Sequence, residues 1–246
     1  MLDDGRPDRC ATIHPMDSLD PPDPLNPLAE ARRAVVAAGM RLSARGLVVA
    51  SEGNISLRTA DGILITPSGR RKDELAAADL VVVGFVVAEA TEDGATHSSD
   101  DATAEAERTG SPRPSSDIAI HRAIYAARPD AAAIVHAHLA ASLALTTVGE
   151  LPDPAELPET ARFIGRLPFV PFFQPGSAAL AAAVATALTD RGPDGLLAPP
   201  DAVLLERHGA IAVGADLVTA GDRLELVDLL CRVHRDVVLL RSAVRR

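Results

Sequence analysis

The sequence predicts one α/β domain in which helices pack on a sheet, and three observations support this class. The chain has 246 residues, which is enough for one domain with a substantial core. Apolar residues make up 47% of the chain and charged residues 24%, as is ordinary for a globular protein. Segments with the apolar period of helices are interleaved with short apolar runs bounded by turn residues, as strands are.

The N-terminal part predicts a helix, a hairpin and a further strand. Residues 1–26 are rich in proline and aspartate and are expected to form a disordered extension, so the domain proper covers 27–246. Residues 28–45 have helical apolar spacing, and Gly46 is a C-cap signal. The next expected elements are a turn and short strand in ASEGNISLR, a return strand and turn in DGILITPSG, and a buried strand in LVVVGFVV.

The C-terminal part predicts helices and strands that follow an insertion. Residues 89–113 are acidic and poor in large apolar side chains, which predicts a disordered loop. Ser115 or Ser116 is expected to N-cap the helix DIAIHRAIYAAR. The remaining expected elements are a buried strand in AAAIVHAHL, a proline-rich irregular stretch over 149–176, a helix from Ser177 to about Thr189, a strand, turn and strand in AVLLERHGAIAVG, and a last helix from about Val218 to Ala243.

Charge and composition argue against several classes of function. The net charge is −10, and much of it lies in 1–27 and 86–113, so the remaining body is near neutral. Nothing in the sequence indicates the clustered basic face that binding nucleic acid requires. No apolar run reaches the ~18 residues that span a bilayer, and the N-terminus lacks the apolar segment of a secretory signal, so a cytoplasmic protein is expected. Cys10 and Cys231 are too few for a disulfide framework. The only lysine, Lys72, lies in the polar run GRRKDE, which makes it a poor Schiff-base nucleophile.

Three histidines are candidate metal ligands. His136 and His138 stand at i and i+2 of an apolar strand, so their imidazoles emerge on the same side. Two polar rings there need partners; a shared metal satisfies both, and so does a hydrogen bond between the rings at a sheet end. His208 follows the strand AVLL and precedes Gly209, which permits a tight turn, although an exposed turn histidine fits this pattern too. Three histidines with an open position are the usual composition of a catalytic zinc site.

A helix start carries a further candidate group. Ser115 and Ser116 precede a helix N-terminus, where free N–H groups favour an anion, and Asp117 lies in the first turn. A plain helix cap with a favourable acid explains the same residues. His121 and Tyr125 follow Asp117 at i+4 and i+8, where they can support its carboxylate or belong to the core.

Two turns rich in small residues are candidate anion sites. EGNIS (52–56) and TPSG (66–69) offer free N–H groups and hydroxyls, as anion-binding turns do. Ordinary hairpin turns have the same residue types.

The chain resembles the class II aldolase/adducin family from about residue 28 to 240. Four motifs carry the resemblance in order and spacing, and these are ASEGNISLR, ILITPSG, RPSSDIAIHRAIYAARPDAAAIVHAH and VLLERHGAIAVG. The family includes L-fuculose-phosphate aldolase, L-ribulose-5-phosphate 4-epimerase, methylthioribulose-1-phosphate dehydratase and sugar-acid phosphate decarboxylases. The resemblance implies a three-layer α/β/α sandwich around a largely antiparallel sheet, and a homotetramer with active sites at subunit interfaces.

The resemblance also implies roles for individual residues. It implies that His136, His138 and His208 bind one divalent metal per subunit, most readily zinc, with manganese or cobalt as alternatives. Asp117 falls at the position of the catalytic acid/base. The residues that correspond to the cradle for the substrate phosphate are Gly53, Asn54, Ser68, Gly69, Ser115 and Ser116.

Two departures from the family pattern bear on the reaction. The aldolases usually have glutamate where this chain has Asp117, and the 4-epimerases tend to have aspartate there. Residues 149–176, however, lack the aspartate beside an aromatic pair that an epimerase would have. Family enzymes often use a tyrosine near the C-terminus of a neighbouring subunit as proton donor, and the run CRVHRDVVLLRSAVRR has none. Tyr125 is the only tyrosine, which implies another donor, such as His234, or another substrate class.

These observations predict a metal-dependent aldolase that cleaves a small phosphorylated ketose through a metal-stabilised enediolate, with Asp117 moving the proton. A 4-epimerase, a decarboxylase or a dehydratase would use the same site. A non-catalytic scaffold like the adducin head is the alternative from another class, and the three retained histidines argue against it. The expected partners are a small phosphorylated sugar and further copies of the chain, with neither nucleic acid nor a membrane.

Overall fold

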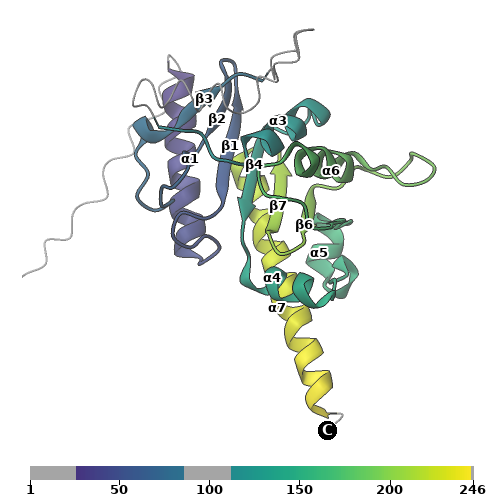
Figure 1. Ribbon diagram of the computed structural model, residues 1–246. Helices are drawn as coiled ribbons and strands as arrows, with labels where there is room; N and C mark the ends of the chain where they lie inside the picture. The colour runs from purple at the N-terminus through teal and green to yellow at the C-terminus, as the bar shows by residue number, and fades with distance from the viewer. Residues whose placement is uncertain (1–25, 86–111, 245–246) are drawn as a thin grey trace, which may run out of the picture.

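The computed structural model describes residues 26–85 and 112–244, and its centre is a seven-stranded sheet (Figure 1). The strands are β1 (Asn54–Thr59), β2 (Gly62–Ile65), β3 (Val81–Val83), β4 (Ala133–Ala137), β5 (Phe169–Val170), β6 (Ala202–Leu205) and β7 (Gly209–Gly214). Their order across the sheet is β3-β2-β1-β4-β7-β6-β5, and neighbours are antiparallel except β5 and β6, which are parallel. The expected α/β fold with a largely antiparallel sheet is confirmed.

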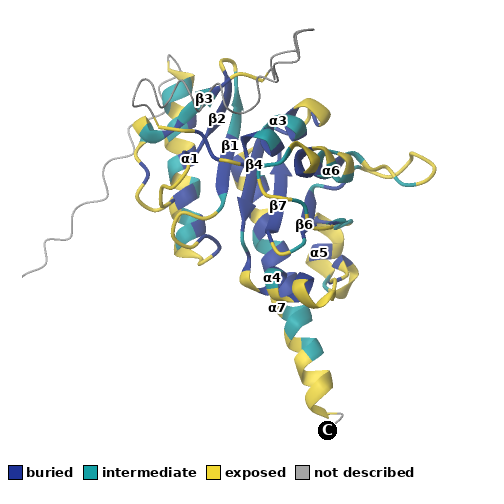
Figure 2. Ribbon diagram, in the orientation of Figure 1, coloured by how far each residue is buried: buried dark blue, intermediate teal, exposed yellow. Residues whose placement is uncertain are grey.

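Helices cover both faces of this sheet, which gives the expected three layers (Figures 1 and 2). The helices are α1 (Pro27–Ala44), α3 (Ile118–Ala127), α4 (Ala140–Val148), α5 (Pro158–Phe163), α6 (Ala178–Thr189) and α7 (Leu217–Val244), with short 3-10 turns η1 (Ala77–Asp79) and η2 (Pro154–Glu156). On one face α1, α4 and α5 pack beside α7, and on the other α3 packs against α6. Within the described ranges, no helix combines the length and the apolar content that crossing a membrane requires.

Alternation along the central strands divides the core between the two faces. In β4, Ala133 and Val135 belong to the apolar cluster of α1 and α7, whereas Ile134 belongs to the cluster of α3 and α6. Successive side chains of a strand point to opposite faces. His136, two residues after Ile134, therefore faces α3 and α6, on the opposite side of the sheet from α7.

The differences from the predicted elements lie at the sheet edge and in the proline-rich stretch. Helices α1, α6 and α7 match their predicted bounds within a residue or two. The strand expected to be buried, LVVVGFVV, is the edge strand β3, and of its three residues only Val83 is buried, because an edge strand has one neighbour. The stretch 149–176, expected to be irregular, contains η2, α5 and β5, and α4 was not expected. The expected extension at 1–26 and insertion at 89–113 lie almost wholly outside the described residues.

Lys72 is buried, contrary to what its polar run indicates. Only 1% of the residue is exposed, and its ammonium group donates to the carbonyl oxygens of Ser51 at 2.9 Å and Arg70 at 3.0 Å. These bonds join the turn before β1 to the turn after β2. Burial lowers the pKa of Lys72 to about 8 from its ordinary value of 10.5. Because the ammonium group bonds to main-chain carbonyls of both turns, the contacts of Lys72 hold the two turns together.

The lowered pKa of Lys72 predicts a pH dependence of stability. Because the unfolded chain binds this proton more tightly than the folded chain, the free energy of unfolding should increase as the pH rises from about 8 to about 10.5. The variant Lys72→Met lacks this titration. Urea unfolding of both proteins at several pH values should therefore show wild type gaining stability relative to the variant across this window. A difference that stays constant with pH would mean that Lys72 titrates normally.

Candidate metal centre

The first histidine is held in β4 by both neighbouring strands. His136 lies opposite Asn54 of β1 and opposite Ile211 of β7. Its Nδ1 donates to the carbonyl oxygen of Ala210 at 2.9 Å, because a carbonyl oxygen only accepts. The lone pair therefore sits on Nε2. His138 comes directly after β4. Because it lies two residues after His136, its side chain is on the same side of the sheet.

His208 reaches the same place from the turn between β6 and β7. Gly209 follows it with φ +107°, and any side chain there would collide with the carbonyl of Ala137 in β4. On the other side of β4, Gly53 has φ +68°, and a Cβ would lie 2.5 Å from the carbonyl oxygen of His136. Glycine alone tolerates both the backbone angle and the close approach. The two glycines thus bring the turns before β1 and β7 against the histidine end of β4.

The three imidazoles converge on one point. The ring centroids of His136 and His138 are 5.0 Å apart, and each lies 4.9 Å from that of His208. One nitrogen of each ring lies within 4.8 Å of a nitrogen of both others. The sequence prediction that these three residues come together agrees with this geometry; their role as ligands stays a prediction.

The chemistry of the rings fits a divalent cation. Nε2 of His136 and Nδ1 of His208 are buried and have no hydrogen-bond partner among the residues described, and such a nitrogen is costly to bury unless something binds it. Burial lowers the pKa of His136 to about 3 and also lowers that of His208, so both rings are neutral near pH 7, the form that binds metals. In the described residues His136 bonds to Ala210, which does not support the alternative of a bond between His136 and His138.

Asp117 is buried beside the histidines at the start of α3. The N-cap position belongs to Asp117, and not to Ser115 or Ser116 as the sequence predicts. Its carboxylate makes no cap hydrogen bond. Instead, Oδ2 lies 3.7 Å from Nε2 of His136 and accepts a 2.8 Å bond from Nδ2 of Asn54. The side chain is therefore directed at the histidine site rather than at the helix it begins.

The surroundings of Asp117 favour its ionised form. Burial by itself raises the pKa of this carboxyl, but the imidazoles of His136, His208 and His121 and the hydrogen bond from Asn54 outweigh burial. The net pKa lies below its ordinary value. A carboxylate that can accept a proton thus lies next to the histidine cluster.

The residues predicted to bind phosphate lie at the start of β1, in the turn after β2 and just before α3. Backbone hydrogen bonds of 2.9 and 3.1 Å join the turn at 66–69 to the segment 113–115. The pairing holds Ser115 before the start of α3, where its Oγ accepts a 3.3 Å hydrogen bond from the backbone N–H of Asp117. Lys72 links the same turn to the one that precedes β1. Of the predicted set, the structure exposes Ser68, Gly69 and Ser116, partly covers Gly53, and buries Asn54 and Ser115.

The sequence indicated the segment 52–56 only as an anion-binding turn, and its side chains make other contacts as well. Glu52 Oε1 lies 3.8 Å from Nδ1 of His138. Asn54 and Ser56 are buried and face α3, where Ser56 bonds to His121. The alternation of polar and apolar residues in NISLR, which gives a strand one polar face, was the available signal.

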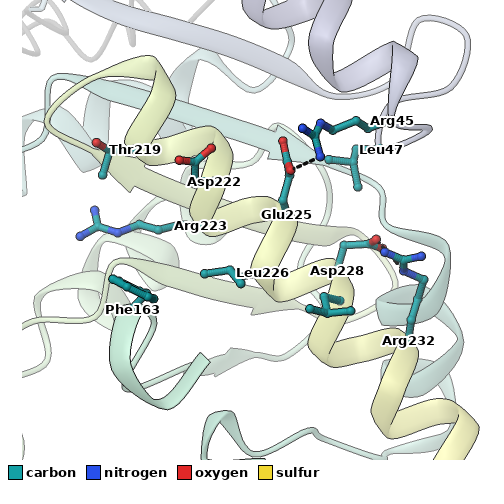
Figure 3. Close-up of a pocket in the computed structure, with 11 residues that line it drawn as sticks. Arg45, Leu47, Phe163, Thr219, Asp222, Arg223, Glu225, Leu226, Asp228 and Arg232 are labelled. Carbon is teal, nitrogen blue, oxygen red and sulfur yellow. Dashed lines mark ion pairs between the residues drawn. The ribbon is translucent and has the colours of Figure 1, made fainter. Parts of the chain in front are cut away.

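Two other features lie on the far face of the sheet. His234, considered as a proton donor, is on α7, where its Nδ1 is hydrogen-bonded to Glu156 of η2 at 2.7 Å. A groove of about 710 Å³ runs along α7 between α5 and the end of α1, lined by both charged and apolar side chains (Figure 3). Arg45 and Glu225 form an ion pair of 2.7 Å there. Neither feature contributes to the histidine cluster of its own chain.

Three converging histidines and a buried carboxylate on an α/β/α sandwich have the composition of a catalytic metal site. The chain belongs to the family described as Class II Aldolase and Adducin N-terminal domain, which it matches over residues 33–235. The resemblance seen in the sequence is confirmed.

Relatives of this chain are named for several reactions. The methylthioribulose-1-phosphate dehydratase of Acidiphilium cryptum is 34% identical over 221 residues, which cover 85% of this chain and 92% of that protein. The 3-oxo-tetronate 4-phosphate decarboxylase of Cupriavidus necator is also 34% identical, with 79% and 78% covered. The crystal structure of L-fuculose-1-phosphate aldolase from Thermus thermophilus matches with a TM-score of 0.67 and 27% identity, covering 87% of this chain and 97% of that one. All three are named as enzymes, which confirms the expectation of an enzyme.

Proposed function

We propose that this chain is a metal-dependent lyase that cleaves a carbon–carbon bond of a small phosphorylated ketose. The observation that carries the proposal is the Asp117 carboxylate beside the histidine cluster, 3.7 Å from Nε2 of His136, which has no hydrogen-bond partner among the described residues. A buried carboxylate beside three converging imidazoles supplies both a proton-transfer group and a set of metal ligands. The relationship to an aldolase named for L-fuculose 1-phosphate supports the reaction class.

His136, His138 and His208 would hold one divalent cation, for which zinc is the best match to three imidazoles, with manganese or cobalt as alternatives. When bound, such a cation supplies a Lewis acid for the substrate's carbonyl oxygen and for the negative charge that develops on it. Neutral histidines leave the full charge of the cation available.

Asp117 would move the proton, because it is the ionised group next to the histidines. The substrate phosphate would bind at the segments that carry Gly53, Asn54, Ser68, Gly69, Ser115 and Ser116, of which Ser68, Gly69 and Ser116 are exposed. Phosphate binding at a distance from the reacting carbon holds the substrate in place, so that its binding energy serves to orient the reacting end.

Dehydration or decarboxylation of a related phosphorylated sugar is the second candidate. The two relatives at 34% identity are named as a dehydratase and a decarboxylase, which favours these reactions. Both reactions also create negative charge next to a carbonyl group and need a group that transfers protons. The aspartate at position 117 additionally keeps the 4-epimerase as an alternative.

A substrate screen distinguishes these reactions and also tests for catalysis itself. Zinc-loaded protein would be incubated with L-fuculose 1-phosphate, 5-methylthioribulose 1-phosphate, 3-oxo-tetronate 4-phosphate and L-ribulose 5-phosphate. We expect release of dihydroxyacetone phosphate; loss of water, release of carbon dioxide or epimerisation would assign the other reactions. His136→Ala, purified identically, controls for contaminating enzymes. Metal-loaded protein that turned over none of the four would favour the non-catalytic scaffold.

We also propose a homotetramer. Beyond the body of the domain, the end of α7 exposes Leu239 by 61%, Leu240 by 66% and Val244 by 87%, an apolar surface that a subunit contact would cover (Figure 2). Light scattering should give about four times the 25.6 kDa of one chain. The mass of a single chain would contradict both the assembly and an active site shared between subunits.

A further inference from the structure

A line of buried hydrogen bonds connects the core of the domain to Asp117. Tyr125 Oη lies 2.9 Å from Ser56 Oγ, and Ser56 Oγ lies 2.6 Å from Nδ1 of His121. Nε2 of His121 lies 2.5 Å from Oδ1 of Asn54, whose Nδ2 lies 2.8 Å from Oδ2 of Asp117. None of the five residues is more than 6% exposed. We call these five residues the Tyr125–Asp117 line.

The two ends of the Asn54 amide set the direction of the bonds from Ser56 to Asp117. Nδ2 of Asn54 donates to Asp117, so the amide oxygen is the atom that faces His121. His121 must then donate from Nε2, and because burial keeps its pKa at about 4, the ring is neutral and Nδ1 accepts. The hydroxyl of Ser56 donates to that nitrogen and is left to accept from Tyr125, whose hydroxyl also donates to the carbonyl oxygen of Ala132 at 3.3 Å. The three donors from Ser56 to Asn54 therefore point towards Asp117.

Two elements combine to produce this line. Asn54 and Ser56 are alternate residues of β1 and share one face of the strand, while Asp117, His121 and Tyr125 are spaced four apart on α3. The polar edge of the helix therefore lies along the polar face of the strand. Asn54 is also the residue opposite His136 in the sheet, so the line ends beside the histidines.

We propose that His121 is a positioning residue that acts through Asn54 to fix the Asp117 carboxylate beside the three histidines. Asn54 alone cannot hold the carboxylate in place, because an amide that turned over would present its oxygen to Asp117. The Nε2–H of His121 opposes that rotation, because this N–H can donate to the amide oxygen of Asn54 but not to its NH2 group. Ser56 and Tyr125 in turn keep the proton of His121 on Nε2. This inference rests on the proposed role of Asp117 as the proton-transfer group.

The test is a double-mutant cycle between His121 and Asp117, using the sugar phosphate that the screen identifies. His121→Leu removes both ring hydrogen bonds at similar size. We expect it to lower kcat about 10–100-fold, the usual range for residues that orient a catalytic group, with KM and metal content unchanged. In an Asp117→Asn background the same change should lower kcat no further. Ile124→Ala, one turn along α3 and fully buried, is the matched control, and it should lose stability but keep kcat within about threefold.

A second measurement needs no turnover. Nitrogen-15 NMR of the histidine rings should show one neutral ring protonated on Nε2 throughout pH 5–9, and its signal should be absent from His121→Leu. Tyr125→Phe, which keeps the ring and removes only the distal hydroxyl, serves if His121→Leu fails to fold. It should lower kcat by a smaller factor, and again not in the Asp117→Asn background.

The outcomes separate this inference from the proposed function. Suppose that Asp117→Asn lowers kcat, and that His121→Leu or Tyr125→Phe lowers kcat by the same factor in the Asp117→Asn background as in wild type. The line then has only a structural role, and only the inference is overturned. A proton on Nδ1 of His121 would also overturn the inference alone. If Asp117→Asn keeps the wild-type rate, both the proton-transfer role and this inference fail.

Discussion

The variant Asp117→Asn is expected to keep its fold and its metal and to turn over substrate about 10²–10⁴-fold more slowly than wild type, the range for loss of a general acid–base group. Asparagine has the same shape, and its amide oxygen can still accept from Nδ2 of Asn54. It cannot take up a proton near neutral pH. The measurement is kcat together with the metal content of the same preparation.

If Asp117 served only to cap α3, the Asp117→Asn variant would keep its turnover, because asparagine caps helices about as well as aspartate. The matched control is Asp216→Asn. Asp216 lies just before α7 and does cap it, accepting a 2.7 Å bond from the backbone N–H of Thr219. Its replacement should leave turnover unchanged. An Asp117→Asn enzyme with a near wild-type rate would return Asp117 to a structural role.

The variant His136→Ala is expected to lose both the metal and the activity. It removes the most buried of the three imidazoles, whose Nε2 has no other partner among the residues described and whose Nδ1 bonds to Ala210. Two remaining histidines form a much weaker site. Metal affinity would be measured by competition with a coloured chelator, and we expect a loss of at least about 100-fold, larger than that from losing a residue that only orients a ligand.

His234→Ala is the matched control for that experiment. It also removes a largely buried imidazole, but one that lies on α7 and pairs with Glu156. The His234→Ala variant should bind the metal with the affinity of wild type. Full metal affinity in His136→Ala would mean that the three histidines do not form the binding site.

Local patterns predicted much of the fold and the place of the candidate site. Helical spacing gave the bounds of α1, α6 and α7, and the glycine turns marked the ends of the hairpins. The i and i+2 spacing of His136 and His138 placed them on one side of a buried strand, as the structure also does. The i and i+4 spacing of Asp117 and His121 likewise indicated that the two residues share one face of α3.

The rest depends on contacts between segments far apart in the sequence. That Asn54 pairs with His136 follows from the register of β1 and β4, which no local pattern contains. The burial of Lys72 depends on carbonyls of two turns, and its charged neighbours indicated the opposite. Ser115 pairs with Thr66 of the turn after β2, and the N-cap of α3 is Asp117, whose side chain is directed at the histidines. These contacts join segments that a local pattern cannot relate.

The central claim is that His136, His138 and His208 together hold one divalent cation. X-ray absorption spectroscopy of zinc-loaded wild-type protein, with the metal content measured on the same sample, tests it most directly. We predict one zinc per chain with three imidazole nitrogens at about 2.0–2.1 Å. Zinc far below one per chain, or a coordination shell without three imidazoles, would contradict it.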